Sequence, residues 1–285
     1  MALSELALLV ASGIAAGLIG SLFGLGGGIL MVPVLVLALK VPMHNAVATS
    51  LLCVIATSSA AAARFVERGV ANVRLGMTLE LWTVLGAMLG SLVAGLLPGN
   101  ALVILFASAM TLMAIPMARK EPALRTLPPP ELPGNAKPRF QKRLGSRYFD
   151  DAEAHEVSYE ISRLPLAMGV SGAAGLLSGL LGVGGGILKV PVLTMYCSVP
   201  MKAAAATSNF MIGVTALASS VVYYGRGEIS PLVTAASVVG VVIGSRAGAQ
   251  ISGKIKGSAL RRAFAVLMIV IAAQLFWKAL SGEIR

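Results

Sequence analysis

Three consecutive glycines interrupt the apolar sequence twice, in GLGGGILMVP at residues 24–33 and in GVGGGILKVP at residues 182–191. Glycine lets the backbone adopt conformations that other residues avoid. A break of this kind before a short apolar helix leaves the first N–H groups of that helix unpaired, and these groups attract anions together with the helix dipole. The glycine runs therefore predict an anion site. Close helix packing through small residues is the alternative.

Hydroxyl side chains follow both glycine runs at the same spacing, as Thr49-Ser50 and Thr207-Ser208. Hydroxyl and amide donors suit an oxyanion, whose oxygens only accept hydrogen bonds. The alternative is a hydrogen bond from each hydroxyl to the carbonyl four residues earlier in its own helix. The polar backbone and side chains that we predict to bind the anion are Gly26, Gly27, Gly28, Thr49, Ser50, Gly184, Gly185, Gly186, Thr207, Ser208 and Asn209.

Two cations within apolar segments complete the predicted site. Lys189 and Arg246 stand where the first half of the sequence has Met31 and Met88. A charge inside a membrane segment is costly and often functional, so both residues are candidates for attracting the anion. The alternative is that each side chain extends to the membrane interface. Glu80 is the comparable acid, with Arg246 or Arg74 as its candidate partner.

Composition indicates a polytopic membrane protein. The chain has 285 residues, of which 56% are hydrophobic and 12% charged, and its mean hydropathy is +0.85. Soluble domains carry about 25% charged residues, whereas apolar runs of nearly ~20 residues recur here, as a membrane span requires. The net charge of +11 comes mostly from residues that flank these runs, so it predicts cytoplasmic loops rather than nucleic-acid binding. The apolar start lacks a basic region and is better explained as a first membrane segment than as a signal peptide.

The chain is an internal duplication with an offset of 158 positions (182 − 24). Residues 24–50 and 182–208 are identical at 17 of 27 positions without a gap. We expect an all-α fold with five apolar segments in each repeat, and whether the short second segment spans the membrane is left open. The domains are the first repeat at 1–118, a polar linker at 119–163 and the second repeat at 164–285. The predicted segments are 5–23, 29–39, 46–63, 75–97 and 101–118, then 165–181, 187–197, 203–223, 231–251 and 260–280.

The distribution of basic residues predicts that the two repeats are inverted. Loop 64–74 is basic where its equivalent 222–232 has one arginine, and 256–262 is basic where 98–104 has no charge. The positive-inside rule then places 64–74, 119–163 and 253–262 in the cytoplasm and both termini outside. The linker is either a tether between inverted halves or a segment that binds a partner. Cys53 and Cys197 match no metal or redox spacing, so we expect free thiols, no cofactor and no catalysis.

These motifs resemble the TauE/SafE family of sulfite exporters. The resemblance rests on GLGGGILMVPVL and GVGGGILKVPVL, each followed by Ala-x-Thr-Ser, and on the pairs Gly86/Gly90 and Gly244/Gly248. It implies an exporter of sulfite or of sulfonates such as sulfoacetate in the cytoplasmic membrane of a bacterium, with the glycine runs and Thr-Ser pairs lining a central site. A passive anion channel or importer, and a membrane scaffold protein with a partner on the linker, are the alternatives. A homodimer is possible through the small-residue faces.

Overall fold

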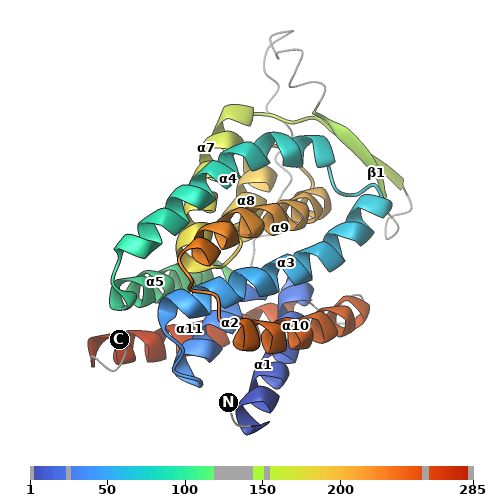
Figure 1. Cartoon of the computed structure of the whole chain (residues 1–285). Coiled ribbons are helices and arrows are strands. Elements are labelled where there is room, and N and C mark those ends of the chain that lie inside the picture. Colours follow the sequence, from blue (N-terminus) through green and yellow to red (C-terminus); the bar gives the residue numbers. More distant parts are fainter. Residues whose placement is uncertain (1–2, 24–26, 119–143, 151–154, 252–256, 282–285) are drawn as a thin grey trace.

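The computed structural model describes residues 3–23, 27–118, 144–150, 155–251 and 257–281, and helices dominate them. The predicted all-α membrane fold is confirmed, because every predicted apolar segment overlaps a helix. Figure 1 shows the arrangement. The elements are α1 (Leu3–Phe23), α2 (Gly28–Leu37), α3 (Met43–Glu67), α4 (Val73–Leu96), α5 (Gly99–Ala118), β1 (Ser146–Asp150), β2 (His155–Tyr159), α7 (Leu164–Leu181), α8 (Gly186–Met195), α9 (Met201–Gly225), α10 (Pro231–Ile251) and α11 (Gly257–Leu280).

Length and composition allow α3, α4, α7, α9 and α10 to cross a membrane. The outer face of α4 exposes Leu81, Leu85 and Leu92, which a bilayer would cover. The short helices α2 and α8 have 10 residues each. At 1.5 Å per residue they extend about 15 Å, half of the ~30 Å hydrocarbon core. The second apolar segment of each half is therefore too short to be a span.

The duplication is visible in the helix bounds. Helices α2 and α8 begin and end 158 residues apart (186 − 28 and 195 − 37), as do α3 and α9 (201 − 43 and 225 − 67). The main helix pairs follow the duplication as well. Helix α1 packs on α10, and their counterparts in the other half, α7 and α4, pack on each other in the same way. Helices α3 and α9 lie side by side between these two pairs (Figure 1). Each pair thus consists of one helix from each half. The inversion of the two halves stays a prediction.

Glycines bring the paired helices into backbone contact. A Cβ atom at Gly17 of α1 would collide with the Val241 carbonyl of α10, and one at Gly244 of α10 would collide with the Ile14 carbonyl of α1. On the other pair, Gly86 of α4 and Gly175 of α7 meet the opposite backbone in the same way. Close packing through small residues is therefore the role of the glycines within the long helices.

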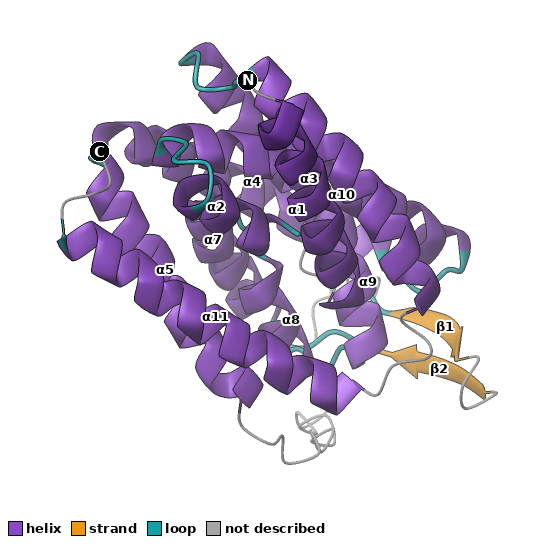
Figure 2. Ribbon diagram, turned by 90° about the horizontal axis from the view of Figure 1, so that it is seen from below, coloured by secondary structure: helices purple, strands orange, loops and turns teal. Residues whose placement is uncertain are grey.

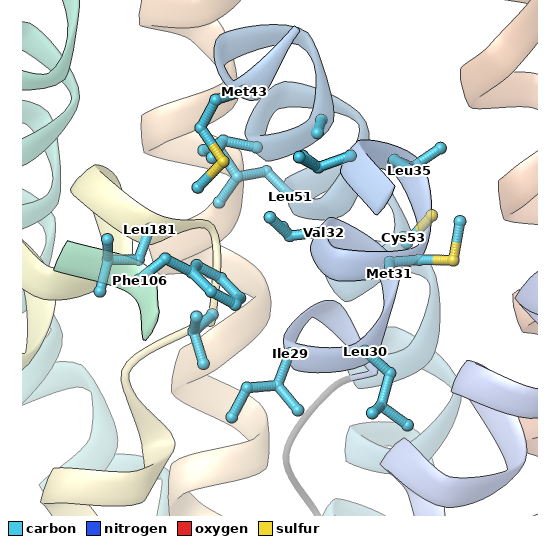
Figure 3. Packing of buried hydrophobic residues seen from close by; sticks show 14 of the residues in the cluster. Ile29, Leu30, Met31, Val32, Leu35, Met43, Leu51, Cys53, Phe106 and Leu181 are labelled. Carbon is cyan, nitrogen blue, oxygen red and sulfur yellow. The ribbon is translucent and has the colours of Figure 1, made fainter. Parts of the chain in front are cut away.

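The larger hydrophobic core surrounds α2, of which Ile29, Met31 and Val32 are at most 1% exposed. These side chains pack among Leu51 of α3 and Phe106 of α5, as Figure 3 shows. Helices α5 and α11 lie against each other along one edge of the molecule (Figure 2). A helix that is apolar on all sides is stable only when it is enclosed, and α2 meets this condition inside protein.

The strands β1 and β2 form an antiparallel hairpin in the part of the predicted linker that the structure describes. The sequence predicted only a polar linker there, with no strand assigned to it. Tyr148 pairs with Val157, and Leu144, Tyr148 and Ile161 are buried against Leu75 and Leu79 of α4. The hairpin projects at one edge of the molecule (Figure 2). The linker is polar overall, but these few apolar side chains pack it onto the helices.

Candidate functional site

The two glycine runs meet at the start of α2. A Cβ atom at Gly28 would lie 2.5 Å from the carbonyl oxygen of Gly182. Gly27 and Gly185 have φ values of 70° and 68°, and Gly184 has 80°, a region that favours glycine. The predicted residue Gly26 lies outside the described residues. The structure thus brings together two breaks that are 158 positions apart in the chain.

Helices α2 and α8 begin at these breaks without side-chain caps. Their N-cap residues are Gly27 and Gly185, and neither offers a side-chain hydrogen bond to the helix. The first N–H groups of an α-helix have no partner within the helix and carry the positive end of its dipole. Each short helix therefore presents backbone donors at the place where the glycine runs meet.

Helices α3 and α9 line both breaks with equivalent residues. Gly28 is next to Ser50 and Val54 of α3, whereas Gly186 is next to Ser208 and Ile212 of α9. The Ser50 hydroxyl donates to the carbonyl of Gly182 at 2.7 Å. The Ser208 Oγ atom is buried and has no hydrogen-bond partner among the described residues. The two halves therefore differ at these hydroxyl groups. That of Ser50 is hydrogen-bonded, whereas that of Ser208, in the second half, is free among the described residues.

The neighbouring threonines do not face the glycine runs with free hydroxyls. Thr49 Oγ1 lies 3.2 Å from Thr234 Oγ1 on α10, and Thr207 Oγ1 accepts from the backbone N–H of Asn72 at 2.9 Å. Both contacts connect helices of different halves. Asn209 is buried on α9 next to Ser208.

Lys189 lies inside the protein, one turn after the second glycine run. Its side chain is 1% exposed, and its Nζ atom has no hydrogen-bond partner in the described part of the chain. A helical side chain leans toward the N-terminus of its own helix, so the ammonium group extends toward the end of α8 where the donors are. An ammonium enclosed in this way does not reach the membrane interface.

Glu80 of α4 is a buried acid, and the residues beside it and beside Lys189, Leu79 and Val190, pack in one hydrophobic cluster. The expectation that Glu80 pairs with Arg246 or Arg74 was wrong, since the side chain of Arg74 is exposed and so is that of Arg246. Thr215 of α9 donates to Glu80 Oε1 at 2.7 Å. Thr215 is three residues after Ile212, which contacts Gly186, so this acid lies close to the second glycine run.

Arg246 is not part of this cluster. It lies on the exposed face of α10, while the glycines at 240, 244 and 248 turn the other face toward α1. The predicted residues that the structure does gather are Gly27, Gly28, Ser50, Gly184, Gly185, Gly186, Lys189 and Ser208.

Sequence reasoning missed Thr215 and assigned no site role to Glu80. The signal for Glu80 was present, because an acid within an apolar segment requires a partner. Thr215 carried no signal, since a single threonine in a membrane helix commonly bonds within its own helix. It also donates to the Met211 carbonyl at 2.9 Å.

The chemistry of the gathered groups is that of an oxyanion site. It combines an ammonium, a free hydroxyl and the positive ends of two short helices. Among the described residues no group of three or more His, Cys, Asp or Glu side chains could hold a metal ion. Cys53 and Cys197 are free and buried, which agrees with the expected thiols.

Comparisons with known proteins support a transporter. The family model described as "Sulfite exporter TauE/SafE" matches residues 9–275. "Probable membrane transporter protein YunE" of Bacillus subtilis is 30% identical over 281 residues, covering 95% of this chain and 97% of that protein. A "Probable membrane transporter protein" of Methanocaldococcus jannaschii is 28% identical over 272 residues, or 90% of each chain. No solved structure matches.

Proposed function

This chain belongs to the sulfite exporter TauE/SafE family, and we propose that it is a secondary transporter that exports a small sulfur-containing anion. The substrate class is sulfite or an organosulfonate such as sulfoacetate. The chain is a multi-pass membrane protein and a membrane transporter by its family and relatives. The proposal adds the substrate, the direction of transport and the bacterial cytoplasmic membrane.

One observation carries the proposal: among the described residues the buried ammonium of Lys189 on α8 has no hydrogen-bond partner, and neither has the buried hydroxyl of Ser208, which lies next to Gly186 at the start of the same helix. Burying a donor without a hydrogen-bond partner costs free energy. An oxyanion at the start of α8 would satisfy both donors together with the unpaired N–H groups of that helix. A sulfonate or sulfite group offers three acceptor oxygens of the required kind.

Transport by alternating access would expose this site to each side of the membrane in turn. The basic loops favour an orientation with the linker in the cytoplasm and both termini outside. In that orientation the substrate enters from the side of the linker hairpin.

The test is efflux of sulfite and sulfoacetate from vesicles that contain the purified protein. Lys189→Met installs the residue of the first repeat and is expected to lower the initial rate at least about tenfold, since it removes the only charge among the gathered donors. Lys202→Met is the matched control, because Lys202 is exposed in the first turn of α9. Equal rates for wild type and Lys189→Met would contradict the proposed site.

A further inference from the structure

Glu80 and Lys189 each keep one polar atom without a partner. The Oε1 atom of Glu80 accepts a hydrogen bond from Thr215, while its Oε2 atom and the Nζ atom of Lys189 are buried and unpartnered in the described residues. Leu79 and Val190, the sequence neighbours of Glu80 and Lys189, pack in one hydrophobic cluster, so the two groups lie in the same part of the interior, although they form no direct hydrogen bond. Each group therefore keeps an atom at which a further partner would bind, a proton at Glu80 Oε2 and an anion at Lys189 Nζ.

Few other charges face Glu80. Helix α7, which packs along α4, contains no charged residue, and Arg163 before it is exposed. Helix α9 has Lys202, exposed in its first turn, and Tyr223, which donates to the Gly179 carbonyl at 2.9 Å. Lys189 is the charged residue of α8.

The remaining neighbours of α4 hold titratable groups in other contacts. On α3, His44 bonds to the Ala94 carbonyl at 3.0 Å, Cys53 lies in the apolar core and Glu67 is exposed. In the cluster around Leu79, Asn72 donates to the Tyr159 hydroxyl at 3.2 Å. Tyr148 and Cys197 pack in that same cluster. Within the described residues, Lys189 is thus the cation that balances Glu80.

An anion at Lys189 would upset this balance. With Glu80 as a carboxylate and Lys189 as an ammonium, the two charges cancel. A bound monovalent anion adds a second negative charge next to the same ammonium, and like charges in a medium of low dielectric repel strongly. The site regains a net charge of zero when the carboxylate takes up a proton and becomes a carboxylic acid.

We infer that Glu80 binds one proton whenever an anion occupies Lys189, so that the anion and the proton cross the membrane together. The inference rests on the proposed function and deepens it. The step is a protonation: Glu80 Oε2, which has no partner, receives the proton on the side where the anion enters. It releases the proton when the anion leaves and Lys189 again balances the carboxylate.

The experiment measures protons and charge during anion transport by the full chain in vesicles. Methanesulfonate serves as the probe alongside sulfite, because its charge does not change with pH in the range used. A pH dye in the vesicle lumen reports protons, and a solid-supported membrane reports current. Wild type is expected to move one proton with each methanesulfonate and to produce little current.

Glu80→Gln has the shape of the protonated acid and cannot release a proton. It is expected to carry methanesulfonate without protons and to produce a current of the sign of the anion. Glu228→Gln is the matched control, since Glu228 pairs with Arg226 at 3.2 Å in the loop after α9. We expect this control to keep the proton coupling of the wild type.

Three outcomes contradict the inference. Wild-type anion flux without protons overturns it and leaves the proposed function intact. Proton flux that persists with the anion in Glu80→Gln assigns the coupling to another residue. Absence of any anion flux from wild type contradicts the proposed function, and the inference fails with it. The wild-type stoichiometry decides the question even where Glu80→Gln does not fold.

Discussion

Single residues determine where the two repeats differ in chemistry. Lys189 replaces Met31 of the first repeat, and the hydroxyl of Ser208 is free where that of Ser50 is bonded to Gly182. Both differences add donors to the second glycine run. The site is therefore asymmetric within a scaffold that is nearly symmetric, and the anion is expected at the start of α8 rather than α2.

The hydroxyl of Thr215 gives a testable prediction for a single residue. Its hydroxyl donates to Glu80 Oε1 at 2.7 Å, and a hydrogen bond to a carboxylate favours the charged form. Thr215→Val removes that bond, so Glu80 holds its proton to a higher pH. The pH at which anion transport is half-maximal should move upward by several tenths of a unit or more. A pH profile of initial rates measures the shift.

The corresponding control is Thr194→Val. Thr194 is on α8 and bonds only to carbonyls of its own helix, Val190 at 2.9 Å and Pro191 at 3.0 Å. Its replacement is expected to leave the profile in place. An unchanged profile for Thr215→Val would show that the hydrogen bond does not affect the protonation of Glu80.

Elements of secondary structure were largely predictable from the sequence. Apolar runs indicated the helices because a membrane segment must satisfy its backbone internally, and the offset of 158 positions located the short helices in both halves. The hairpin was missed because its strands are short and mostly polar. The proximity of Glu80 to Lys189 was also missed, since 109 positions separate them (189 − 80) and only the packing of α4 and α8 on α9 brings them together.

The glycine-mediated helix pairs give a prediction for stability. A Cβ atom at Gly175 would collide with the Thr83 carbonyl of α4, whereas one at Gly169 of the same helix meets nothing within 4 Å. Gly175→Ala should therefore destabilise the protein by about 1–3 kcal/mol or more. Gly169→Ala should be neutral or stabilise it by up to ~1 kcal/mol through helix propensity. Thermal unfolding in detergent micelles compares the two, and equal midpoints would contradict the observed contact.

At the scale of the whole molecule, Asn72 joins three distant parts of the chain. Its side chain caps α4 by accepting from the Leu75 N–H at 3.0 Å and donates to the Leu144 carbonyl at 2.8 Å beside the hairpin. Its backbone N–H donates to Thr207 of α9. Burial raises the pKa of the Tyr159 phenol, so at neutral pH this hydroxyl stays protonated next to Asn72.

Asn72→Ala is expected to lower the free energy of unfolding by about 1–2 kcal/mol, because it removes a helix cap and a buried hydrogen bond. Tyr159→Phe removes one contact of the same group and should cost less. Limited proteolysis of the linker should also become faster in Asn72→Ala if the hairpin detaches. A variant with unchanged stability and unchanged proteolysis would show that apolar contacts alone hold the hairpin.

The exchange of helices between the halves determines how the molecule can divide. Glycine contacts fix α1 on α10 and α4 on α7, so each of these pairs takes one helix from each half. Helices α3 and α9 pack on each other between the two pairs. The chain passes from one pair to the other in the loops after α3 and α9, at Gly69 and Gly227, which have positive φ and no neighbour within 4 Å of a Cβ atom. A movement of one pair against the other would bend these two loops, and it would carry together helices that were not duplicated together.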